Sequence, residues 1–140
     1  MPTPDRTILL VEDDPGHARL VMKNLRRAGV THQVVWVDDG LRAVELLLRQ
    51  GAYRQDAAPL PDLVLLDLNL PGLSGIQVLA QLRSRERTRN LPVAMLTTSD
   101  QPEEILRCVE LGCNAYLRKP LGDAQRAETI ARIMHLLSAA

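Results

Sequence analysis

The chain has 140 residues, of which 46% are hydrophobic and 24% are charged, a composition typical of one globular domain that buries its own core. Seventeen basic and seventeen acidic side chains cancel, so no strong global field favours nucleic acid or an anionic membrane as a partner. No apolar run approaches the ~18 residues of a membrane span, and the N-terminus lacks a signal core. Cys108 and Cys113 do not have the spacing of a zinc or redox site, and we expect reduced thiols in a cytoplasmic protein.

Short apolar runs alternate along the chain with segments of helical periodicity. The first two units are Ile8–Val11 with a helical stripe capped at Gly29, and Val34–Val37 with a stripe that ends at Gly51. The third unit is Leu63–Leu66 with a helix through Val78–Leu82. The fourth is Val93–Leu96 with a helix through Ile105–Val109 that stops near Gly112. The fifth is Ala115–Leu117 with a last helix over 127–137. Residues 83–90 carry four arginines without aromatic residues between them, so we expect a solvated rim there rather than a nucleic-acid patch.

Three of the five runs are apolar at consecutive positions, as in strands that are covered on both faces. Five strand–helix units with right-handed crossovers predict an α/β, doubly wound (βα)5 flavodoxin-like fold, with a parallel five-stranded sheet in the order 2-1-3-4-5. We expect a single domain over residues 1–140, with its core at about 6–138. Ligands of such folds bind at the carboxyl ends of the strands where the strand order reverses, which here is the place of Asp13 and Asp67.

Acidic residues follow the first and the third predicted strands. Asp14 precedes Pro15 and is interpreted as a helix N-cap, which leaves Glu12 and Asp13 at the strand end beside Asp67. Like charges ~4 Å apart repel by about 4 kcal/mol at an effective dielectric near 20, so this cluster should take up protons or hold a cation. Carboxylate oxygens with open positions for water and phosphate fit Mg²⁺ better than Ca²⁺ or zinc.

Asp67 stands directly after the apolar run LVLL, where an unpaired charge is costly. Ser74 is a suitable cap for the next helix, so Asp67 is not needed for capping. Pro71, Gly72 and Gly75 predict a tight loop whose backbone amides can approach an anion. A carboxylate in that place can act as a nucleophile and carry an acyl phosphate.

Thr97 and Lys119 follow the fourth and fifth predicted strands. Each has an ordinary alternative, since Thr97 is also a normal strand residue and Lys119 is also compatible with a surface lysine. Together with Asp67 they supply a donor for one phosphate oxygen and a positive charge for another. A cis bond before Pro120 would aim the ammonium into the crevice, and this is a hypothesis. The three histidines are scattered, and we assign none of them to chemistry.

The ordered set of motifs resembles the receiver domains of two-component response regulators. The acid pair lies in VEDDP, Asp67 in LLDLNLPGLSG, Thr97 in MLTTSD, and Tyr116 with Lys119 in AYLRKP, so the resemblance covers essentially the whole chain. It implies that Asp67 is phosphorylated by the phosphohistidine of a sensor histidine kinase. It also implies a metal site for Mg²⁺, made by Glu12, Asp13, Asp67 and the main-chain carbonyl of Asn69.

The resemblance further implies a phosphoacceptor switch and not an enzyme, with self-phosphorylation and self-dephosphorylation as its only chemistry. Lys119 would pair with Asp67 and then with the phosphate, Thr97 would donate its hydroxyl to the phosphate, and Tyr116 would change rotamer as Thr97 moves. In this family the fourth helix, fifth strand and fifth helix form the output face, which also serves as a homodimer interface.

Two features resemble the single-domain regulators that pair with bacterial phytochrome-type kinases. These are the sequence PDLVLLDLNLP and the long connection over residues 51–61. The resemblance therefore implies a phytochrome-type kinase as partner and no output domain, while a histidine phosphotransfer protein is equally compatible as partner.

Two other functions compete with this interpretation. The first is a small-molecule phosphohydrolase that forms an aspartyl phosphate, but Asn69 stands where such an enzyme needs a second acid. The second is a degenerate receiver or a flavodoxin-like binding module, which the complete acid set, Thr97 and Lys119 argue against.

Overall fold

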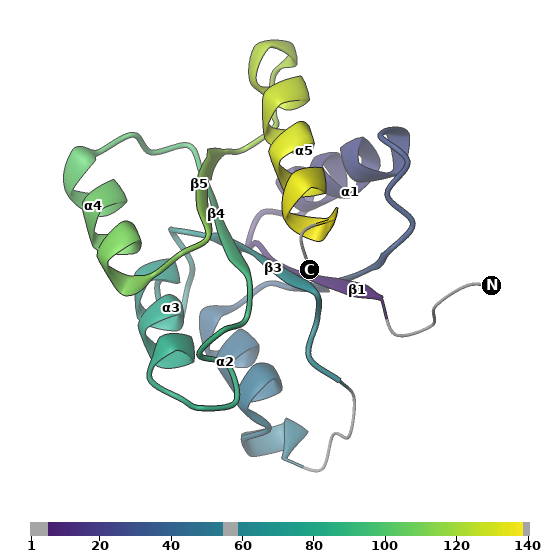
Figure 1. The fold of residues 1–140 in the computed structure, drawn as a ribbon. Coiled ribbons are helices and arrows are strands. Elements are labelled where there is room, and N and C mark those ends of the chain that lie inside the picture. The colour runs from purple at the N-terminus through teal and green to yellow at the C-terminus, as the bar shows by residue number, and fades with distance from the viewer. Residues whose placement is uncertain (1–5, 55–58, 139–140) are drawn as a thin grey trace.

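The computed structural model describes residues 6–54 and 59–138, which form a three-layer α/β domain (Figure 1). One parallel sheet has the strand order β2-β1-β3-β4-β5, so the predicted doubly wound (βα)5 fold and its strand order are confirmed. The strands are β1 Thr7–Val11, β2 Gln33–Val37, β3 Leu63–Asp67, β4 Val93–Thr97 and β5 Ala115–Arg118. The α-helices are α1 Pro15–Arg27, α2 Gly40–Leu48, α3 Gly75–Arg83, α4 Pro102–Leu111 and α5 Asp123–Ser138, and a short 3-10 helix η1 spans Gly51–Tyr53. The long connection expected over residues 51–61 lies partly outside the described residues.

Helices cover both faces of the sheet. Helices α1 and α5 lie on one face, and α2, α3 and α4 lie on the other (Figure 1). Side chains alternate between these faces along each strand, so Ile8 and Leu10 pack under α1 and α5, whereas Leu9 and Val11 pack under α2 and α3. Every residue of β3 and β4 is buried, which explains why their apolar runs are continuous. Among the described helices, none is long and apolar enough to cross a bilayer.

Local capping follows the sequence signals at most helix ends. Asp14 caps α1 by accepting hydrogen bonds from the main-chain nitrogens of Gly16 and His17, and Ser74 forms a capping box with Gln77 at the start of α3. Gly112 ends α4 in the left-handed region with φ of 91°. The prediction that Gly51 ends the second helix is wrong.

The second helix, α2, ends at Leu48 because Arg49 adopts the left-handed conformation with φ of 55°. The main-chain nitrogen of Gln50 then donates to the carbonyl of Glu45 at 2.8 Å, which closes the helix before the chain reaches Gly51. Arg49 therefore adopts a left-handed backbone conformation that is uncommon for residues other than glycine.

The arginine-rich segment 83–90 is largely exposed, as expected for a solvated rim, and two of its arginines also bind main-chain carbonyls. The Arg83 guanidinium donates to the carbonyls of Gly112 at 3.0 Å and Thr88 at 3.2 Å and to Oδ1 of Asn114 at 3.1 Å. Arg87 donates to the carbonyl of Leu47 at 3.1 Å. The carbonyls of Gly112 and Leu47 lie at the ends of helices, where main-chain carbonyls lack partners within the helix, and the carbonyl of Thr88 also accepts from the main-chain nitrogen of Leu91 at 3.1 Å.

Candidate functional site

Strand pairing brings residues that are distant in sequence to one edge of the sheet. Val11 pairs with Leu66 and Asp67 pairs with Leu96, so the residue after β1 lies beside the end of β3. Thr97 pairs with Arg118, so the residue after β5 follows directly beyond the end of β4. The carboxyl ends of four strands therefore present Glu12, Asp67, Thr97 and Lys119 on one edge.

Lys119 lies at the centre of this edge. Its Nζ is 2.8 Å from Oε1 of Glu12, 3.0 Å from Oδ2 of Asp67 and 3.1 Å from Nδ1 of His17. Glu12, Asp67 and Lys119 are 2%, 5% and 7% exposed, so two carboxylates share one ammonium in a site from which bulk water is largely excluded. Charges buried in this way need partners, and the ammonium is the partner of both acids.

Asp13 adds a third carboxylate on the solvent side of the pair. Glu12, Asp13 and Asp67 each have one carboxylate oxygen within 4.8 Å of a carboxylate oxygen of the other two. Asp13 is exposed, whereas Glu12 and Asp67 are buried. Three anionic oxygen donors with an open side fit a hard divalent cation that keeps some of its waters. Asn69 stands next to this group and is exposed, and its main-chain nitrogen lies 3.4 Å from Oδ1 of Asp67.

The electrostatics of the cluster show excess negative charge. Burial raises the pKa of Glu12 to about 7, and the hydrogen bond from Lys119 opposes this only in part. Burial alone would lower the pKa of Lys119, but its hydrogen bonds to Glu12 and Asp67 outweigh burial and raise this pKa. The ammonium therefore stays charged at neutral pH, because it always has an anionic acceptor. Glu12 is the group that takes up a proton when no further cation is present.

A chain of hydrogen bonds leads from the site towards α4. Thr97 is fully buried, and its hydroxyl oxygen accepts a hydrogen bond from the main-chain nitrogen of Ser99 at 3.0 Å. The phenol of Tyr116 donates to the carbonyl of Ser99 at 3.1 Å, and the Ser99 hydroxyl donates to Glu104 on α4. The β4–α4 loop thus connects Thr97 with Tyr116 and with the first turn of α4.

The loop after Asp67 is as tight as the sequence predicts. The main-chain nitrogen of Gly75 donates to the carbonyl of Leu68 at 2.8 Å. A Cβ at Gly75 would lie 2.2 Å from the carbonyl oxygen of Asp67, so only glycine permits this approach of α3 to the end of β3.

The bond between Lys119 and Pro120 is trans, since none of the described peptide bonds is cis. The cis hypothesis is therefore wrong. The ammonium reaches the site because the main-chain nitrogen of Lys119 donates to the carbonyl of Thr97 at 3.0 Å and continues the pairing of β4 with β5. On the other side of the bond, Nδ2 of Asn24 donates to the carbonyl of Pro120 at 3.1 Å.

Two residues of the site were missed by sequence reasoning. His17, in the first turn of α1, contacts Lys119, and the indole of Trp36 on β2 donates to the carbonyl of Glu12 at 2.7 Å. The position of His17 three residues after the N-cap Asp14 indicates a place near the strand edge, but it does not show the direction of the side chain. Trp36 gave no signal beyond its place near the end of an edge strand.

Comparisons with known proteins agree with this geometry. The model of the response regulator receiver domain family matches residues 8–131. Response regulator Rcp1 of Synechocystis sp. is 40% identical over 116 residues, which cover 83% of this chain and 78% of that protein. The solved structure of Mn²⁺-bound Rcp1 has a TM-score of 0.80 at 36% identity and covers 91% of each chain. The phosphorylated cyanobacterial phytochrome response regulator RcpA has a TM-score of 0.84 at 36% identity and covers 96% of each chain.

Proposed function

The chain belongs to the response regulator receiver domain family, and from this premise we propose that it accepts a phosphoryl group on Asp67 from the phosphohistidine of a sensor histidine kinase. The observation that carries the proposal is the buried contact between Lys119 and Asp67 at 3.0 Å, beside the acid pair Glu12 and Asp13. A buried carboxylate with a fixed ammonium next to it is suited to receive a phosphoryl group, because the ammonium stabilises the negative charge that the phosphoryl group brings into the site.

In the proposed step, a carboxylate oxygen of Asp67 attacks phosphorus. The new O–P bond forms as the P–N bond to the kinase histidine breaks, and the leaving imidazole keeps the electron pair and takes up a proton. The ammonium of Lys119 and the hydroxyl of Thr97 donate to phosphoryl oxygens, which requires Lys119 to exchange Asp67 for the phosphoryl group. Water later attacks phosphorus of the acyl phosphate, which returns the Asp67 carboxylate and releases inorganic phosphate.

The same acids would hold a divalent ion, which we propose to be Mg²⁺. Its ligands would be the carboxylates of Glu12, Asp13 and Asp67 and the main-chain carbonyl of Asn69. When bound, the ion neutralises phosphoryl oxygens and relieves the repulsion among the acids. Support comes from the all-oxygen donor set and from the Mn²⁺ in the structure of Rcp1.

Phosphorylation would change a surface through the β4–α4 loop. The Thr97 hydroxyl would donate to a phosphoryl oxygen, and a shift of this side chain towards that oxygen would move Oγ1 away from the main-chain nitrogen of Ser99, which now donates to it. Because Tyr116 donates to the carbonyl of the same Ser99, the phenol would change rotamer as the loop moves. Leu106 and Val109 on α4 are both 58% exposed, and we propose that the α4–β5–α5 face that includes them binds the target or a second copy.

The partner would be a phytochrome-type kinase, because RcpA is a phytochrome response regulator. A histidine phosphotransfer protein presents the same phosphohistidine and would use the same site. A small-molecule phosphohydrolase is disfavoured, because Asn69 cannot act as the acid that releases a leaving alcohol.

The proposal is tested by incubation with acetyl phosphate and Mg²⁺ followed by intact-protein mass spectrometry. The wild type should gain the mass of one phosphoryl group, and Asp67→Asn should gain none. Asp38→Asn, which removes an exposed acid after β2, is the control and should behave as the wild type. A normal gain in Asp67→Asn, or sustained turnover of p-nitrophenyl phosphate by the wild type, would contradict the proposal.

A further inference from the structure

His17 lies between the buried cluster and solvent. Its Nδ1 is 3.1 Å from Nζ of Lys119 and 3.9 Å from Oε1 of Glu12, and its Nε2 is 3.6 Å from Oδ2 of Asp14. The side chain is 32% exposed, so one edge of the ring faces the site and the other faces the rim.

The hydrogen-bond inventory fixes the role of each ring nitrogen. An ammonium has three N–H donors and no acceptor, and Lys119 has three partners, namely Glu12, Asp67 and His17. Nδ1 of His17 must therefore accept, which places the ring hydrogen on Nε2, towards Asp14.

The three hydrogen-bond acceptors of Lys119 have different roles in the proposed function. Asp67 would be converted into an acyl phosphate, and Glu12 would turn to the divalent ion. His17 is the one acceptor that takes no part in either event. It can keep its hydrogen bond while the ammonium exchanges Asp67 for a phosphoryl oxygen.

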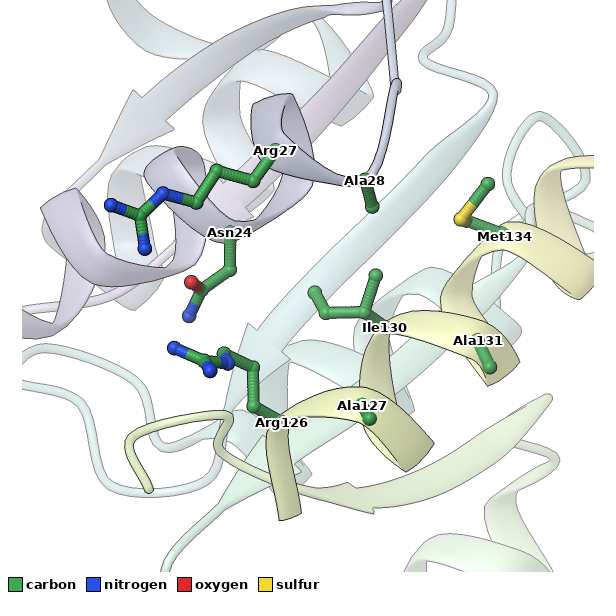
Figure 2. Close-up of a pocket in the computed structure, with 8 residues that line it drawn as sticks. All are labelled: Asn24, Arg27, Ala28, Arg126, Ala127, Ile130, Ala131 and Met134. Carbon is green, nitrogen blue, oxygen red and sulfur yellow. The ribbon is translucent and has the colours of Figure 1, made fainter. Parts of the chain in front are cut away.

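Helix α1 also holds the main chain beyond Lys119. Asn24 is 6% exposed and donates to the carbonyl of Pro120 at 3.1 Å. Figure 2 shows Asn24 extending from α1 towards Arg126 of α5, across a groove with a volume of about 410 Å³. His17 and Asn24 are seven residues apart, or two helical turns, and so lie on the same face of α1.

We propose that His17 is a positioning residue for Lys119. The imidazole holds the ammonium at the rim of the site while Glu12 and Asp67 are engaged, and Asn24 fixes the chain on the other side of the lysine. The inference rests on the proposed function and adds to it a residue of this chain that acts through Lys119.

The first test observes the ammonium directly. Lys23 and Lys119 are the only lysines, and Lys23 is exposed, so protein labelled with ¹⁵N-lysine should show one Nζ signal that is protected from solvent exchange. In the presence of Mg²⁺, His17→Ala and His17→Gln should lose this protection, because neither places an acceptor at the position of Nδ1. His17→Asn should keep it, since its carbonyl oxygen takes that position. His135→Ala, on an exposed part of α5, is the control.

The second test measures phosphoryl uptake from acetyl phosphate at saturating Mg²⁺. Loss of one hydrogen bond to a charged group should slow uptake in His17→Ala and His17→Gln by about ten- to a hundredfold, and His17→Asn should restore it. An unchanged Lys119 signal in His17→Ala and His17→Gln, or uptake equal to the wild type in both, would overturn the inference. If the wild type takes up no phosphate, the proposed function fails, whereas the lysine signal still decides the role of His17.

Discussion

Replacement of Lys119 by methionine removes the one ammonium that two buried carboxylates share. Methionine keeps the length of the aliphatic stem, so the change acts mainly on charge and hydrogen bonding. Glu12 and Asp67 then face each other without a cation, at exposures of 2% and 5%. Lys23→Met is the matched control, because Lys23 is the other lysine of the chain and is exposed.

The size of the effect follows from the cost of a buried charge without its partner, which is roughly 3–5 kcal/mol. Glu12 reduces this cost by taking up a proton, since its pKa is about 7 and the hydrogen bond from Lys119 that lowers it is lost. We therefore expect Lys119→Met to lose about 2–4 kcal/mol of unfolding free energy at pH 8 without metal, and Lys23→Met to change it by less than about 0.5 kcal/mol.

The pH dependence has a definite sign. The pKa of Glu12 is raised on folding from 4.5 to about 7, so the folded protein binds more protons than the unfolded chain between these values. Stability must therefore fall as the pH rises through this range. In Lys119→Met the loss of the ammonium raises the pKa of Glu12 further, so the fall should extend to higher pH and the variant should be closer to the wild type at pH 6 than at pH 8.

Urea denaturation followed by circular dichroism, at pH 6 and pH 8 and with EDTA or Mg²⁺, measures these differences. Mg²⁺ should restore the variant more than it stabilises the wild type, because the ion supplies the missing positive charge. If Lys119→Met is as stable as the wild type at pH 8 in EDTA, the ammonium does not compensate the two acids and the reasoning is refuted.

Two further predictions follow from the site. Protons compete with the divalent ion for Glu12, whose pKa is about 7, so the Kd for Mg²⁺ should rise about tenfold from pH 8 to pH 6. Isothermal titration calorimetry should show this rise in the wild type and only a small rise in Glu12→Gln. Gly75→Ala would place a Cβ 2.2 Å from the carbonyl oxygen of Asp67 and should lose about 1–3 kcal/mol of unfolding free energy. In the same thermal unfolding experiment Gly16→Ala should be nearly neutral, since its Cβ would meet only the Asp14 side chain, at 3.2 Å; equal stability of the two variants would contradict the steric argument.

Sequence reasoning was most successful where the geometry of a parallel sheet decides the outcome. Parallel strands end on one edge, so Asp67, Thr97 and Lys119 had to come close as soon as their runs were assigned as strands. In the structure, Nζ of Lys119 lies 3.0 Å from Oδ2 of Asp67. The strand order followed from the assignment to the flavodoxin-like class, and the strand pairing confirms it.

Sequence reasoning failed where the packing of a helix against the sheet decides the outcome. The direction of His17 depends on the rotation of α1 about its axis, which is set by all the contacts under α1 at once. Arg83 binds the carbonyl of Gly112, which is distant in sequence, and the carbonyl of Thr88 in the turn after α3, and no local pattern predicts either contact. Helix α2 ends at Leu48, before Gly51, because the main-chain nitrogen of Gln50 donates to the carbonyl of Glu45. This hydrogen bond outweighs the preference for glycine at the left-handed position of Arg49.

The hydrogen bond from Trp36 to the carbonyl of Glu12 has a practical consequence. The chain contains one tryptophan, and its indole is 40% exposed while it contacts the main chain of an acid in the cluster. Its fluorescence therefore arises from a single place at the border of the site, where the local field changes when charge is added or removed. The molecule carries its own optical probe, which allows occupancy of the acidic edge to be followed in solution without a label.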